Sequence, residues 1–186
     1  MSAPAQPGRP RRVALVPGVL ALLPEYASLV DPVADLRAAA LGAVGWLAEA
    51  GPVEVVADAQ GQRVAAHLLA EVGGVATQPL DAGDGPVLVV ANGTARRGEK
   101  APGHLDDRAR PFDDRLAVAL GVPAGAAGAP DPAALATLDE SLAGELLVGH
   151  VAGLRALGRL LTPERRAEVG YADDPFGVQY WVVRWA

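Results

Sequence analysis

A short apolar run near the middle of the chain constrains the fold more than any other feature. It reads Val-Leu-Val-Val-Ala over residues 87–91, with Gly85-Pro86 before it and Asn92-Gly93 after it. A run of this length that is rich in β-branched residues and bounded by turn residues is typical of a buried strand. Strands that are apolar throughout belong to parallel sheets that helices cover on both faces. The run therefore predicts an α/β protein with a mainly parallel central sheet.

Further apolar and helical segments alternate along the chain around this run. Strands are expected at residues 11–16, 53–57, 75–80, 87–91 and 177–185, and helices at residues 31–50, 63–72, 107–120, 131–147 and 150–161. Asp-Pro pairs at 31–32 and 131–132 predict helix N-caps followed by proline in the first helical position. Pro79 assigns the third strand to a sheet edge, because proline donates no ladder hydrogen bond.

The alternation predicts one three-layer αβα domain over residues 11–186, after a flexible tail over residues 1–10. The first and fourth strands are apolar throughout, as central parallel strands should be. We therefore expect their carboxyl ends to lie side by side, with Pro17-Gly18 next to Asn92-Gly93.

Composition limits the classes of function. The net charge of −6 argues against a general nucleic-acid binder. The absence of cysteine excludes disulfides, zinc–thiolate sites, iron–sulfur clusters and cysteine nucleophiles. The apolar run at 13–23 is shorter than the ~20 residues that span a bilayer, and Pro17 interrupts it. We expect a cytoplasmic protein with no signal peptide, no membrane partner and no nucleic-acid partner. A small anionic or aromatic ligand and homo-oligomerisation stay open.

Polar side chains crowd the segment after the central run, where α/β proteins bind ligands outside the carboxyl ends of their strands. The candidate ligand-binding residues are Asn92, Thr94, Arg96, Arg97, Glu99, Lys100 and His104. One interpretation is an anion site built from turn N–H groups and nearby cations. The other is a structural turn whose basic residues pair with neighbouring acids. Either way, we expect Arg96 or Arg97 to be fixed by a carboxylate of this segment or of the turn at Asp173-Asp174.

No catalytic motif is recognisable in the chain. Walker, Gly-x-Gly-x-x-Gly and Gly-x-Ser-x-Gly patterns are all absent. His104 with Asp106 or Glu99 has ligand chemistry that suits iron or manganese, but a facial triad needs two histidines and a carboxylate. We expect His67 to be structural and His150 to be a helix cap or a surface residue. The residues alone predict neither a metal site nor a catalytic group.

Two segments resemble a known family. They are Asn-Gly-Thr-Ala-Arg-Arg-Gly-Glu-Lys-Ala-Pro-Gly-His-Leu-Asp-Asp-Arg-Ala at 92–109, continued by Pro111-Phe112-Asp113, and Tyr-Ala-Asp-Asp-Pro-Phe-Gly-Val-Gln-Tyr at 171–180. They are similar to an actinobacterial branch of the class III extradiol ring-cleavage dioxygenases, related to the catalytic B subunit that opens protocatechuate-type rings. The resemblance covers most of the chain and is strongest over residues 87–186. It implies an αβα fold and, in active members, Fe²⁺ held by two histidines and a glutamate, with another histidine as acid/base.

The chain departs from the family pattern at each histidine. Gly18 follows Pro17 where the resemblance implies the first ligand, and Asp58-Ala59-Gln60 stands where it implies the second. Thr94-Ala95-Arg96 occupies the place of the acid/base histidine. We therefore expect an extradiol dioxygenase B-subunit-like protein with a degenerate iron site, no cofactor and little or no catalysis. The alternative is a non-catalytic module that binds a small anionic ligand or a protein partner through the Asn92–Lys100 loop.

Overall fold

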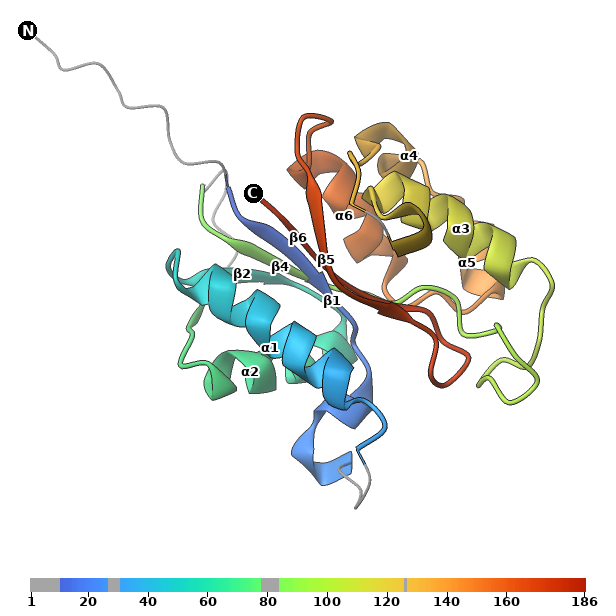
Figure 1. The fold of residues 1–186 in the computed structure, drawn as a ribbon, viewed down its shortest axis with the longest axis horizontal. Helices are drawn as coiled ribbons and strands as arrows, with labels where there is room; N and C mark the ends of the chain where they lie inside the picture. Colours follow the sequence, from blue (N-terminus) through green and yellow to red (C-terminus); the bar gives the residue numbers. More distant parts are fainter. Residues whose placement is uncertain (1–10, 27–30, 78–83, 126) are drawn as a thin grey trace, which may run out of the picture.

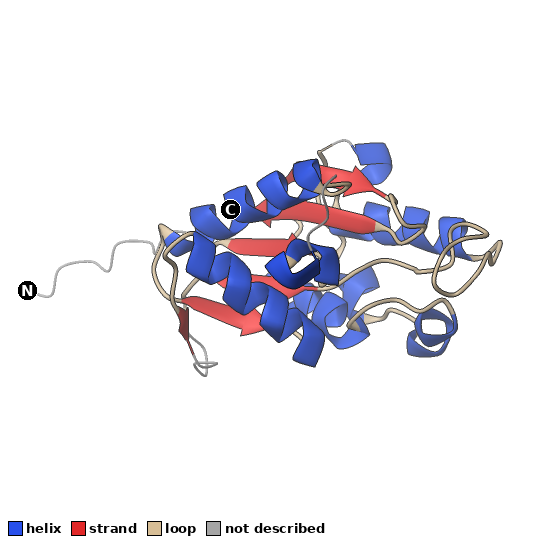
Figure 2. Cartoon of the chain, turned by 90° about the horizontal axis from the view of Figure 1, so that it is seen from below, coloured by secondary structure: helices blue, strands red, loops and turns tan. Residues whose placement is uncertain are grey.

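The described residues fold around a six-stranded mixed sheet with helices on both faces (Figures 1 and 2). The computed structural model describes residues 11–26, 31–77, 84–125 and 127–186. The strands described are β1 (Val13–Val16), β2 (Val53–Val56), β3 (Ala76–Thr77), β4 (Val87–Val90), β5 (Ala167–Asp173) and β6 (Tyr180–Trp185). The helices described are α1 (Ala34–Ala48), α2 (Ala59–Glu71), α3 (Ala109–Leu120), α4 (Pro132–Ala136), α5 (Glu140–Glu145) and α6 (Val151–Leu160), with short 3₁₀ turns η1 (Leu20–Leu22), η2 (Pro24–Tyr26) and η3 (Pro123–Gly125). The predicted α/β class is confirmed.

The strand order is β3-β2-β4-β1-β6-β5. β3, β2, β4 and β1 are parallel, whereas β6 is antiparallel to β1 and β5 is antiparallel to β6. The sheet is therefore mixed, and the mainly parallel arrangement holds only for its first four strands. β1 and β4 pair in register from Val13 with Val87 to Val16 with Val90. Their carboxyl ends lie side by side, as predicted.

The two central strands are apolar throughout because helices cover both of their faces. Side chains alternate across a strand, so Leu15 and Val89 pack with α3 and α6 while Val16 and Val90 pack with α1 and α2. All eight residues of β1 and β4 are at most 1% exposed. Burying each large aliphatic side chain contributes about 1.5–3 kcal/mol to folding. None of the helices in the described stretches is long and apolar enough to cross a membrane.

The connections that follow β1 and β4 lie on opposite faces of the sheet. The chain after β1 leads through η1 to α1 on one face, and the chain after β4 leads to α3 on the other. Neighbouring parallel strands whose connections diverge in this way form a topological switch point, the place where open α/β sheets bind ligands. The loops that begin at Pro17 and Asn92 meet at this point.

Several predicted helix boundaries are wrong. α1 begins at Ala34 because Asp31 does not cap it; the Asp31 carboxylate instead accepts from Val33 N–H and pairs with Arg37. The helix expected at residues 63–72 begins at Ala59, since Asp58 caps it through Gly61 N–H at 2.7 Å. The helix expected at 131–147 is two helices, each with an aspartate cap, Asp131 for α4 and Asp139 for α5.

The largest correction concerns the C-terminal strands. One strand was expected at 177–185, but β6 pairs with an additional strand, β5, across the turn at Asp174–Gly177. β5 is an edge strand with mostly exposed or half-exposed residues, so it lacks the apolar pattern of a buried strand. The third strand is confirmed at an edge over Ala76–Thr77, whereas residues 78–80 and the tail 1–10 lie outside the described residues.

Candidate functional site

The residues predicted as a candidate site begin where β1 and β4 end. Ala91 N–H donates to Val16 O at 3.0 Å and extends the pairing of the two strands. Asn92 Oδ1 then accepts from Gly18 N–H at 2.9 Å. The Asn92 N–H donates to Gly149 O at 3.1 Å. Asn92 thereby joins both strand ends to the segment before α6.

Two side chains that sequence reasoning missed also reach this edge of the sheet. Gln60, in the first turn of α2, donates its Nε2 to Gly18 O at 2.6 Å. His150 Nδ1 lies 2.9 Å from Val90 O, and this nitrogen carries the proton because a carbonyl only accepts. His150 occupies the N-cap position of α6, but its side chain makes no capping bond. No sequence signal marks this contact, since His150 and Val90 are 60 residues apart.

Thr94 and Asp113 form a buried polar pair just beyond the switch point. Their side chains are 0% and 1% exposed. Asp113, in α3, accepts from the Thr94 hydroxyl at 2.6 Å and from the Thr94 N–H at 3.0 Å. Gly93 packs so closely against this carboxylate that an added Cβ would lie 2.7 Å from Asp113 Oδ1. Thr94 is thus part of the structural support of the loop and is closed to a ligand.

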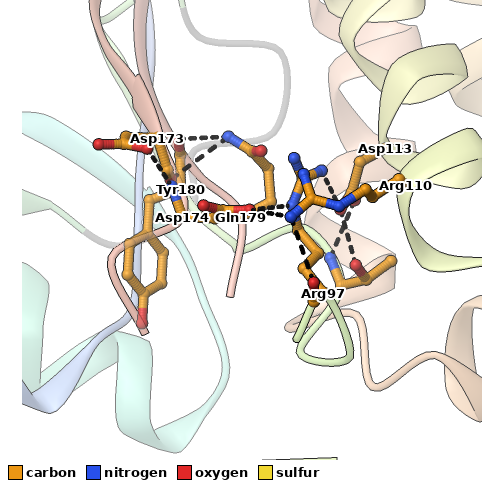
Figure 3. A network of polar contacts seen from close by, with 8 residues as sticks. Arg97, Arg110, Asp113, Asp173, Asp174, Gln179 and Tyr180 are labelled. Carbon is orange, nitrogen blue, oxygen red and sulfur yellow. Dashed lines mark hydrogen bonds and ion pairs between the residues drawn. The ribbon is translucent and has the colours of Figure 1, made fainter. Parts of the chain in front are cut away.

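Arg97 completes this arrangement as an ion-pair network (Figure 3). Its Nη1 donates to Asp113 at 3.0 Å and its Nε donates to Asp174 at 2.6 Å, with only 11% of the Arg97 side chain exposed. Arg110 lies 3.4 Å from the same Asp174. The network ties the loop after β4 to α3 and to the β5–β6 turn. The expectation that a carboxylate of this segment or of the C-terminal turn fixes an arginine is confirmed.

The pKa values of the buried pair reflect two opposing effects. Burial is the largest influence on Asp113 and raises its pKa, against the lowering effect of Thr94 and Arg97. For Arg97, burial lowers the pKa, but the two aspartates together outweigh it and raise the pKa overall. The shift at Asp113 disfavours its charge whereas the shift at Arg97 favours its charge. We take the pair as ionised near neutral pH, because the carboxylate accepts three hydrogen bonds, one of them from a cation.

The remaining candidates are not drawn into this network. Glu99, Lys100 and His104 are exposed. Arg96 is half-buried, and its Nε is the one buried side-chain nitrogen or oxygen without a hydrogen-bond partner among the described residues. The seven candidates therefore separate into a structural group, made of Asn92, Thr94 and Arg97, and a second group whose side chains have no hydrogen bond or ion pair with a described residue.

The donor set at the switch point does not fit a ferrous ion. No group of three His, Cys, Asp or Glu side chains in the described stretches is placed to hold a metal. At the position after Pro17, where the resemblance implies a histidine, Gly18 directs its N–H to Asn92. Asp58, after β2, is engaged in capping α2. Besides these groups the edge offers the imidazole of His150, whose Nδ1 faces Val90 O, and the amides of Asn92 and Gln60. One imidazole with amides falls short of the two imidazoles and the carboxylate that hold Fe²⁺ in the facial triad.

Comparison of the chain with models of known protein families and with curated proteins gives no match.

Proposed function

We propose that the chain is a class III extradiol dioxygenase B-subunit-like protein whose iron site has degenerated, and that it binds a small ligand without opening rings. The family assignment is supported by the resemblance of residues 92–113 and 171–180, together with an α/β sheet whose β1 and β4 ends meet at a switch point. The loss of the iron site is supported above all by Gly18. This residue offers no metal-binding side chain, and its N–H is already bonded to Asn92.

The first test is the metal content of the protein expressed with ferrous iron supplied. We expect iron far below one atom per chain after dialysis, and no oxygen uptake with protocatechuate. Stoichiometric iron that survives dialysis, or ring opening above the background of a buffer control, would overturn the proposal.

A second test introduces histidines at the positions where the resemblance implies the iron ligands. Gln60 Nε2 contacts Gly18 O, so histidines introduced at both positions would lie next to each other. A Cβ at Gly18 would approach Val90 Cγ1 at 3.3 Å, which a small rotation of the valine side chain relieves. If an iron site has been lost here, the Gly18→His/Gln60→His variant should bind Co²⁺ at least about tenfold more tightly than the wild-type protein.

The control for this test is Gly18→His combined with Gln62→His, because Gln62 is an exposed residue of the same helix. Equal Co²⁺ affinity in the two double variants would mean that the switch point is not a former metal site. That result would count against the family assignment, independently of the iron measurement.

A second candidate function is an anion-binding module, and Arg96 is the observation that favours it. Arg97 is occupied by two aspartates, so the available cations of the loop are reduced to Arg96 and Lys100. Neither residue has an ion pair with a described residue, whereas the adjacent Arg97 has two.

A further inference from the structure

A groove of about 350 Å³ lies between α3 and the two short helices α4 and α5, which Figure 1 shows next to one another. We call it the α3–α5 groove, and its volume is within the range of about 300–1,000 Å³ that is typical of small-molecule sites. We propose that it binds a free α-amino acid with a large aliphatic side chain. The side chain lies on the apolar floor, the carboxylate on Arg115 and the ammonium group on Asp139. No residue of the switch point lines the groove, so this inference goes beyond the proposed function.

The floor of the groove is formed by one face of α3 and by leucines from the other side. Phe112, Leu116 and Ala119 follow one another at the four- and three-residue spacing that places side chains on one side of a helix. All three are buried. Leu138 and Leu142 complete the floor and are only half-buried, so part of their apolar surface is open to a ligand. The floor therefore offers apolar contact to an aliphatic side chain.

The groove lies where the helix expected over residues 131–147 is interrupted. Thr137, Leu138 and Asp139 separate α4 from α5, and all three residues line the groove. Asp139 Oδ1 accepts from Leu142 N–H at 3.0 Å and caps α5. This cap uses one carboxylate oxygen of an exposed residue, and the described residues donate no hydrogen bond to the other. The second oxygen is thus available to an ammonium group at the rim.

Arg115 supplies a cation to the same rim. It is exposed, so a ligand can reach its guanidinium, and it lines the groove. Arg108 and Arg110, at the start of the same helix, have carboxylate partners, whereas Arg115 has no ion pair within the described stretches. Arg115 and Asp139 are not paired with each other, which leaves room for a ligand between the two charges.

The two opposite charges restrict the ligand class. A purely anionic ligand would bring its charge toward Asp139, and a purely cationic ligand would bring its charge toward Arg115. An α-amino acid carries both signs of charge on one carbon, next to its side chain. A single small molecule therefore complements both charged residues and the apolar floor.

The test is isothermal titration at low salt with L-leucine and three compounds that each lack one of its groups. Isocaproate lacks the ammonium group, isoamylamine lacks the carboxylate, and L-alanine lacks most of the side chain. We expect L-leucine to bind at millimolar concentration. Isocaproate and isoamylamine should bind at least about threefold more weakly, because each loses one ion pair of an exposed site. L-Alanine should bind at least about tenfold more weakly, because it loses most of the apolar contact.

Variants assign each group of the ligand to its residue. Arg115→Ala should weaken L-leucine binding at least about threefold and leave isoamylamine, which has no carboxylate, unchanged. Asp139→Asn should weaken L-leucine by a similar factor without weakening isocaproate, while asparagine still caps α5. Ala134 is exposed and lines the groove, so Ala134→Phe should fill it and weaken L-leucine at least about tenfold.

The chain offers a matched control for each variant. Arg159→Ala removes an exposed arginine of α6, Asp131→Asn neutralises the aspartate that caps α4, and Ala133→Phe adds the same ring one residue away on α4. None of these three residues lines the groove, so the controls should bind L-leucine as the wild type does. Circular dichroism verifies that each variant is folded.

Three results would overturn the inference. They are the absence of L-leucine binding at millimolar concentration, equal binding of L-leucine and L-alanine, and equal affinity of the Ala134→Phe and Ala133→Phe variants for L-leucine. None of these results bears on whether the protein binds iron, so this inference and the proposed function fail separately.

Discussion

Arg97, through its ion pair with Asp113, is expected to contribute far more to the stability of the fold than any other cation of the same loop. The two side chains are 11% and 1% exposed. Arg97→Ala leaves the buried Asp113 carboxylate without its cation, which costs about 3–5 kcal/mol for a buried pair. For a domain of this size, about 2–4 °C are lost per kcal/mol, so the melting midpoint should fall by roughly 6–20 °C.

Arg96→Ala is the matched comparison, because the two arginines are consecutive. The side chain of Arg96 has no hydrogen bond or ion pair with a described residue, so its removal should cost less than about 1 kcal/mol. Thermal unfolding followed by circular dichroism at neutral pH measures both midpoints. Equal shifts in the two variants, or a larger shift for Arg96→Ala, would refute the assignment of Arg97 to the structural network.

A double-mutant cycle then isolates the ionic contribution. Asp113→Asn retains the shape of the side chain and removes its charge, so Arg97→Ala should be less destabilising in the Asp113→Asn background than in the wild type. Additive losses would indicate that Arg97 and Asp113 are not coupled, in contradiction to the contact between them.

Three further predictions concern the same region. The pKa of Asp106 is lowered to about 2, first by the side chain of Arg108 and then by its N–H. Stability from this pair should therefore be present above the unfolded pKa near 4 and lost as the pH falls toward 2. Arg108→Ala should raise the Asp106 pKa in an NMR titration. Gly93→Ala should destabilise the protein by about 1–3 kcal/mol in urea unfolding, since its Cβ would lie within 2.9 Å of three buried atoms. Asn92→Ala should cost about 1–3 kcal/mol in the same assay, because it leaves Gly18 N–H buried without an acceptor; an unchanged midpoint would mean that water replaces the side chain.

The sequence by itself determined the central part of the fold. β1 and β4 are predictable because a strand buried on both faces must be apolar at every position, and turn residues mark where each run ends. The same patterns predict that the two strands are neighbours. The charge density of the loop after β4 predicts a fixed arginine, since carboxylates and guanidinium groups that crowd one segment will pair. The local residue pattern therefore determined the two central strands, their burial on both faces and the location of the candidate site.

Only the tertiary structure decided the edge of the sheet and the role of each polar residue. β5 could not be predicted from the sequence, because it is an edge strand that is stabilised by pairing with β6 and has no apolar pattern of its own. Arg96 and Arg97 are identical in chemistry, and only the packing of α3 and the β5–β6 turn brings two aspartates to one of them. His150 reaches Val90 O, and Leu147 reaches Gly103, by contacts between segments more than 40 residues apart. Such contacts depend on how the chain packs back against the sheet. The local residue pattern does not show which distant segments will come into contact.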